Sequence, residues 1–141
     1  MQEKLSLKDR ISISKYRQEI AQKRLKAAKF LLKEGFYNDA VSKAYFAIHA
    51  VSRAILILRD IRASTHDGVK IMLSKELIKE AKILPQDFAK KYSQLKALRE
   101  DADYEDFITY TKEDAEEAID IADKFIQKVH VIIKGIIKKR S

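Results

Sequence analysis

The chain has 141 residues, of which 46% are hydrophobic and 35% are charged, with three Gly, one Pro and no Cys. This composition favours a single helical domain over residues 1–141, and it excludes disulfide and thiolate chemistry. The formal net charge of +8 favours a polyanion such as RNA or DNA as partner, with solvated helix faces as the structural alternative.

The N-terminal segment carries charges throughout and has no apolar core of the kind that a signal peptide needs. No uncharged apolar run reaches about 18 residues, so the sequence predicts no membrane partner. The absence of Cys suits a reducing compartment. We therefore expect a cytoplasmic protein.

Apolar spacing predicts two long helices in the first half of the chain. The first spans about 12–34 or begins as early as Ser6, and Gly35 follows it as a residue that tolerates positive φ. The second spans about 39–59, and either Asn38 or Asp39 is expected to cap its first amides. Apolar residues surround most of the second helix, which predicts a central place in a bundle.

A shorter helix is expected over 67–79, and Pro85 marks the boundary before a helix over about 86–103. Thr111 and Asp114 match a capping box, so the last helix begins there and continues to the basic C-terminal end. The predicted fold class is all-α, an antiparallel up-and-down four-helix bundle with an additional short helix. The first and last helices are expected to flank the second.

His49 lies one helical turn after Tyr45 and one turn before Arg53 on the second helix. This edge either lines a pocket or contains a histidine that is hydrogen-bonded within the core. His130 lies among apolar residues near the chain's end, where we expect a packed or surface histidine.

His66 belongs to the polar segment THDG, which enters the short helix. Thr65 or Asp67 caps that helix, and Gly68 allows another chain or a ligand to approach closely. The segment either serves only as a cap that orders the loop, or the free amides at the helix start bind an anion or nucleotide.

Arg99, Asp103 and Tyr104 form a second polar cluster. It is either an ion pair that ends a helix, or a site in which Arg99 binds a phosphate and Tyr104 stacks on a base. Metal chemistry is not expected, because no Glu-x-x-His pair, HExxH or CxxC motif occurs, and no cofactor is expected either.

Four segments, GFYNDAVSKAYFAIHAVSRAILIL, THDGV, ALREDADYEDF and TKEDAEEAIDIADKFI, resemble the HEPN (higher eukaryotes and prokaryotes nucleotide-binding) domain family in order and spacing. The resemblance covers about residues 27–125 and is greatest to the small stand-alone archaeal and bacterial branch. It implies a four- or five-helix bundle, commonly a homodimer, often encoded beside a minimal nucleotidyltransferase as a toxin–antitoxin pair.

Many HEPN proteins resemble metal-independent ribonucleases that carry an Arg-x(4–6)-His motif at a dimer cleft. In such a site the histidine assists attack by the RNA 2′-hydroxyl, and the arginine stabilises the charged phosphate. Arg99 matches the motif's arginine by its place in the helix order, but residues 104–106 are Tyr, Glu and Asp. Arg59 and His66 have the right spacing, but they lie one helix earlier.

Three functions therefore remain open. The leading interpretation is a nucleotide- or RNA-binding module, the toxin-like half of a toxin–antitoxin pair. The second is a metal-independent endoribonuclease in which His66 and Arg99 are catalytic and are brought together from different helices. The third is a non-catalytic domain for self-association or for pairing with a nucleotidyltransferase. The candidate ligand-binding residues are Arg99, Asp103, Tyr104, Thr65, His66, Tyr45 and His49.

Overall fold

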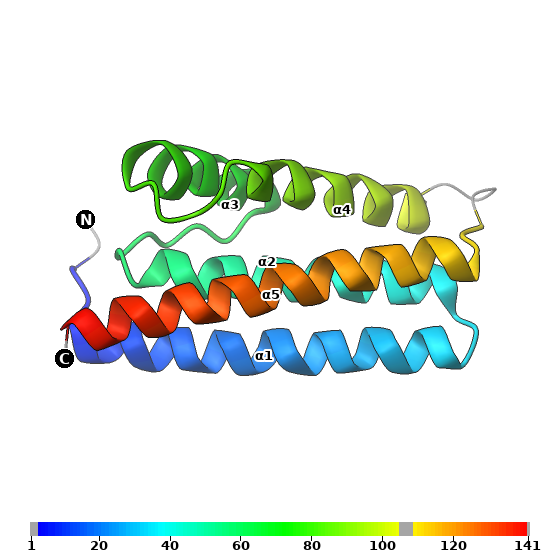
Figure 1. Cartoon of the computed structure of the whole chain (residues 1–141), viewed down its shortest axis with the longest axis horizontal. Helices are drawn as coiled ribbons and strands as arrows, with labels where there is room; N and C mark the ends of the chain where they lie inside the picture. Colours follow the sequence, from blue (N-terminus) through cyan, green and yellow to red (C-terminus); the bar gives the residue numbers. More distant parts are fainter. Residues whose placement is uncertain (1–2, 105–108, 141) are drawn as a thin grey trace.

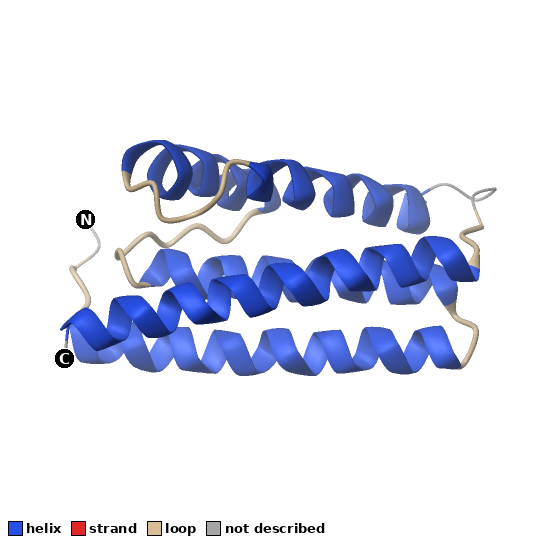
Figure 2. Cartoon of the chain, in the orientation of Figure 1, coloured by secondary structure: helices blue, strands red, loops and turns tan. Residues whose placement is uncertain are grey.

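The computed structural model describes residues 3–104 and 109–140, and within these ranges the side chains of residues 103, 104 and 140 are not described. These ranges contain helices and no strand (Figure 2). The four long helices alternate in direction, and a short helical segment lies between the second and the third of them (Figure 1). The helices are α1 (Leu7–Lys33), α2 (Tyr37–Ile57), α3 (His66–Met72), η1 (Leu73–Glu80), α4 (Asp87–Tyr104) and α5 (Lys112–Arg140). The predicted all-α bundle is confirmed.

Helix α2 is the centre of the molecule, because it packs against α1, α4 and α5. By length and composition it could cross a membrane, but 78% of its most apolar window is buried by the rest of the protein, as in the core helix of a bundle. Helices α1, α2 and α5 pack against one another, and α3, η1 and α4 lie on the side of α2 away from α1 (Figure 1).

Three helix ends follow the predicted local chemistry. Ser6 Oγ accepts a hydrogen bond from the Asp9 amide at 3.1 Å, so α1 uses the earlier of its two expected starts. Gly35 has φ +86° in the turn after α1. At the start of α5, Thr111 Oγ1 accepts from the Asp114 amide at 3.1 Å, and Asp114 Oδ2 accepts from the Thr111 amide at 2.9 Å. These two bonds complete the predicted capping box.

Two local expectations were wrong. Helix α2 begins at Tyr37 without a side-chain cap, and Asn38 Oδ1 instead accepts from the Tyr110 amide at 2.8 Å. That bond joins the α2 start to the chain just before α5. The helix expected over 67–79 is two segments, because its geometry changes from α-helical to π-helical at Leu73.

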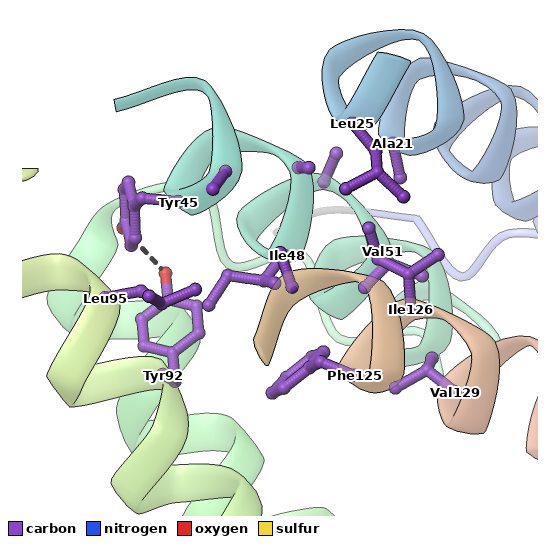
Figure 3. Close-up of a cluster of buried hydrophobic side chains, with 14 of the residues drawn as sticks. Ala21, Leu25, Tyr45, Ile48, Val51, Tyr92, Leu95, Phe125, Ile126 and Val129 are labelled. Atoms are coloured by element: carbon purple, nitrogen blue, oxygen red, sulfur yellow. Dashed lines mark hydrogen bonds between the residues drawn. The ribbon is translucent and has the colours of Figure 1, made fainter. Parts of the chain in front are cut away.

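The core has an apolar side and a mixed side, and both are built on α2 (Figure 3). Val51 lies with Ile126 of α5 and near Leu25 of α1 on the apolar side. On the other side, the hydroxyl groups of Tyr45 and Tyr92 point toward one another between α2 and α4. The polar groups on this mixed side lead directly to the candidate site.

Candidate functional site

A chain of hydrogen bonds crosses the interface between α2, α3 and α4. His49 Nδ1 lies 2.7 Å from the Tyr92 hydroxyl, which lies 2.9 Å from the Tyr45 hydroxyl (Figure 3 draws the second bond). The Tyr45 hydroxyl is in turn hydrogen-bonded to Nδ1 of His66, the first residue of α3. We call these four residues the Tyr–His relay.

The relay is largely buried. Tyr45 and Tyr92 are fully buried, and His49 is 8% exposed, whereas His66 is half-buried. Buried polar groups are costly unless they are hydrogen-bonded, and here the members satisfy one another. Of the two sequence interpretations of His49, the structure supports the histidine that is hydrogen-bonded within the core, with its ring centroid 5.0 Å from that of His66.

The surroundings keep both relay histidines neutral near pH 7. Burial, followed by the electrostatic influence of the neighbouring His66 and of the positive Arg53 and Arg24, lowers the pKa of His49 to about 4. The pKa of His66 is also lowered, first by burial and then by Arg99 and Lys96. A neutral imidazole can accept a proton or a hydrogen bond, which a charged one cannot.

Phe46 joins the relay to two arginines. Its half-buried ring lies 5.0 Å from the Arg99 guanidinium carbon and 5.9 Å from that of Arg24. The His66 ring centroid lies 6.2 Å from the centroid of the same ring. Arg24 is also held by its Nη1, which donates to the Phe46 carbonyl at 3.1 Å. We call Phe46, Arg24, His66 and Arg99 the Phe46 site.

More positive charge gathers beside this site. Burial and the nearby Arg53 guanidinium lower the pKa of both Arg17 and Arg24. Arg53 Nε donates to the Ala63 carbonyl at 3.1 Å, and Arg17 Nη1 donates to the Arg53 carbonyl at 3.2 Å. Within the described ranges, no carboxylate forms an ion pair with Arg17, Arg24 or Arg53. Bound backbone carbonyls position these charges but do not neutralise them.

The start of α3 is fixed by its own residues. Thr65 Oγ1 accepts from the Gly68 amide at 3.0 Å, so Thr65 is the N-cap. A Cβ at Gly68 would lie 2.7 Å from that hydroxyl, so the glycine makes room for the cap. Asp67 forms an ion pair with Lys96 of α4 at 2.8 Å, which joins α3 to α4 beside His66.

The structure thus brings together His66 and Arg99, as the hypothesis of a site shared between helices requires, and it places Tyr45 and His49 behind His66. The side chains of Asp103 and Tyr104, at the end of α4, lie outside the described residues. What these residues do stays a prediction.

Two other expectations concern residues outside this cluster. Arg59 faces the end of α5, where it lines a hollow with Ile136 and Lys139, so it does not face His66. His130 is half-buried on α5, and its Nδ1 lies 2.7 Å from Gln18 Oε1 of α1. It is therefore partly packed at the contact between α1 and α5.

Sequence reasoning missed three members of this region. The spacing of Tyr92 predicts only a buried stripe, and nothing in it indicates that the hydroxyl meets His49. Phe46 fits the core by its pattern, and Arg24 is one base among many on α1. A paired signal was nevertheless present: Tyr45 and His49 are one turn apart, and a buried polar edge on an apolar helix requires polar partners.

Comparison with known proteins agrees with this architecture. Residues 14–133 match the HEPN domain model. The chain is 32% identical over 122 residues to Putative toxin MJ0142 of Methanocaldococcus jannaschii, covering 85% of this chain and 82% of that protein. It is 33% identical to Putative toxin MJ0605 of the same organism over 84% of this chain and 87% of that protein.

A third relative, a UPF0332 protein of Thermotoga maritima, is 25% identical over 92% of this chain and 98% of its own length. Among solved structures, TT1696 from Thermus thermophilus superposes with a TM-score of 0.73 at 25% identity, covering 84% of this chain and 97% of that one. The match to the family model covers most of the chain and extends across all the helices that build the site. The chain belongs to the HEPN domain family.

Proposed function

We propose that this chain is a toxin-like HEPN module that binds RNA or nucleotides at the Phe46 site. The toxin-like character rests on the family and on the names of the two archaeal relatives. The observation that carries the ligand class is the placement of Arg24 and Arg99 around one half-buried aromatic ring, with His66 beside it.

This arrangement matches the chemistry of a nucleotide. A guanidinium binds phosphate oxygens through two parallel hydrogen bonds, and an aromatic ring offers a face on which a base stacks. Arg53 and Arg17 add positive charge nearby without acidic partners in the described ranges. Because like charges at short range repel, a bound phosphate would relieve this repulsion as well as form new bonds.

The surface next to the site extends the positive region. A hollow of about 600 Å³ begins at Asp67, adjacent in sequence to His66, and follows α3 and η1. Three lysines on its rim, Lys70, Lys75 and Lys79, outnumber its one carboxylate, which is paired with Lys96. A single-stranded RNA leaving the Phe46 site along this hollow would place its phosphates near these lysines.

Binding of labelled single-stranded RNA at several salt concentrations tests the proposal. We expect affinity to fall steeply with salt, and Arg99→Ala to weaken binding about tenfold and to lower the salt slope by about one contact. Lys128→Ala is the matched control, because it removes an exposed positive charge from α5. Equal effects of both substitutions, or an affinity that does not depend on salt, would refute the Phe46 site.

A second candidate function, a metal-independent endoribonuclease, is favoured by the state of His66. Its pKa is lowered, so the ring is neutral at pH 7, and Arg99 lies beside the same Phe46 ring as His66. A neutral histidine beside an arginine is suited to proton removal and charge stabilisation. Cleavage of single-stranded RNA in EDTA that is lost in His66→Ala and kept in His130→Ala would support this activity. Cleavage that persists in His66→Ala would exclude it.

We also propose that two copies of the chain associate, and that a minimal nucleotidyltransferase is a further partner. The exposed side chains Tyr16, Phe30 and Val131 offer apolar surface on α1 and α5 for such contacts. Light scattering of the purified chain should give the mass of a dimer. A dimer without any RNA affinity would instead favour the third interpretation, a non-catalytic pairing domain.

A further inference from the structure

We propose that His49, Tyr92 and Tyr45 are positioning residues that fix which ring nitrogen of His66 carries the proton. Their hydrogen bonds form one continuous series that ends at Nδ1 of His66. The series makes Nδ1 the protonated nitrogen and leaves Nε2 as the acceptor. The tautomer is inferred for the chain without any ligand. Only the next step, in which a bound RNA donates a hydrogen bond to Nε2, rests on the proposed function.

The direction of the series is set at its His49 end. The backbone of Ser64 acts to raise the pKa of His49, which is the effect of a carbonyl acceptor beside the ring and not of an N–H donor. Nδ1 faces the Tyr92 hydroxyl, so the nitrogen that donates to Ser64 is Nε2. The neutral ring carries one proton, and this proton is on Nε2. Nδ1 of His49 is therefore an acceptor.

The two tyrosines transmit this direction, because each hydroxyl has a single proton. Tyr92 donates its proton to His49 Nδ1, so its oxygen can only accept from Tyr45 across the 2.9 Å contact. Tyr45 thereby uses its own proton, and its oxygen accepts from His66. Burial raises the pKa of both phenols, so neither proton is lost near neutral pH.

At the other end, the partner of Tyr45 must be a donor, so His66 Nδ1 carries the proton. The reverse tautomer would set two lone pairs against each other beside the fully buried Tyr45. A neutral histidine in water favours the opposite form, with the proton on Nε2. The relay therefore imposes on His66 a tautomer that it would not adopt by itself.

An unprotonated Nε2 is the nitrogen on the side of the ring away from Tyr45. It can accept a hydrogen bond or a proton from a donor in the ligand. The 2′-hydroxyl is the donor that RNA has and DNA lacks. The inference thus narrows the proposed ligand to RNA, with His66 Nε2 at the sugar and Arg99 at the phosphate.

Nitrogen-15 NMR of the imidazole groups in the full chain, without any ligand, tests the tautomer. At pH 7.5 we expect His66 to show a protonated Nδ1 and an unprotonated Nε2. His130 is an internal reference, because it bonds to Gln18 and not to the relay. A His66 signal with the proton on Nε2 in the native chain would overturn the inference, whether or not the chain binds RNA.

Substitutions then test the cause. Tyr92→Phe interrupts the relay without touching His66, and we expect the His66 signals to shift toward the other tautomer, while those of His130 stay unchanged. Tyr16→Phe is the control, because Tyr16 is 65% exposed on α1. Unchanged His66 signals in a folded Tyr92→Phe protein would show that the relay does not set the tautomer. The tautomer can be correct while RNA fails to bind, so the two proposals fail separately.

Discussion

The two sides of helix α2 are held to their neighbours by different kinds of contact. Toward α1 and α5 it packs apolar residues such as Val51 against Ile126, and the interface is held by hydrophobic burial. Toward α3 and α4 it presents Tyr45 and His49, which are held by hydrogen bonds to His66 and Tyr92. Apolar packing tolerates small shifts of its members, whereas the polar series needs every member in place.

This contrast separates stability from function. The apolar side provides a rigid support along the length of α2, and the polar side uses that support to hold His66 at the surface beside Arg99. The effects of substitutions on the two sides should therefore differ in type, stability or function, as well as in size.

The largest expected effect on folding is a cavity on the apolar side. Ile126 is 1% exposed, and Ile126→Ala should lower the free energy of unfolding by about 2–5 kcal/mol, because the bundle cannot fill the space completely. Urea denaturation measures this loss. RNA affinity should stay unchanged under conditions in which the variant is folded, and a selective loss of affinity would show that the two sides are coupled.

The next largest expected effect is the pH dependence of the free energy of unfolding that arises from the polar side of α2. His49 has a pKa of about 4 in the folded chain and about 6.5 in the unfolded chain, so the unfolded chain binds more protons between these values. The contribution of His49 to the free energy of unfolding is fully present above pH 6.5 and is lost as the pH falls toward 4. This loss is about 3 kcal/mol at most. His66 acts in the same direction.

Urea denaturation at pH 7.5 and pH 4.5 checks this dependence. Carboxylates also contribute over this range, so the comparison is with His49→Gln, which keeps a polar side chain but cannot titrate. The difference in stability between the two pH values should be smaller in His49→Gln. An equal difference in both proteins would show that His49 is not held neutral by the fold.

Removing one member of the relay should have a moderate effect. Tyr92→Phe keeps the ring but leaves Tyr45 and His49 each without one partner, which should cost about 1–3 kcal/mol. Thermal denaturation against Tyr16→Phe, at an exposed position, measures it. A Tyr92→Phe protein as stable as the native chain would mean that the buried hydroxyl contributes nothing to folding.

The smallest effect is expected at the start of α3. Thr65→Ala removes the hydroxyl that accepts from the Gly68 amide and should cost about 1 kcal/mol. Hydrogen exchange of the amides in α3 should accelerate more than that in α1, because the lost cap acts locally. Uniform acceleration across the bundle would show that α3 unfolds only with the whole protein.

Most of the fold was predictable because it depends on local patterns. Apolar periodicity places α1, α2, α4 and α5, while Gly35 and the Thr111 capping box mark their ends. The π-helical segment that begins at Leu73 has no such local signal, and the Asn38 side chain binds a residue 72 positions away, Tyr110. Neither could be found by scanning neighbours in the sequence.

The candidate site was predictable only in its parts. His66 and Arg99 stand out from their local surroundings, and Tyr45 with His49 from their spacing on α2. The links between them depend on how α3 and α4 dock on α2, which brings Tyr92 to His49 and Phe46 to Arg99. Those contacts join residues that are far apart in the sequence, and helical periodicity does not predict them.

The central claim is that His66 and Arg99 act on the same RNA phosphate and sugar. A double-mutant cycle measures it directly: RNA affinity of the native chain, His66→Ala, Arg99→Ala and the double variant at one salt concentration. Shared action predicts a coupling energy of at least about 0.5 kcal/mol between the two positions. Strictly additive losses, or no loss in either single variant, would contradict it.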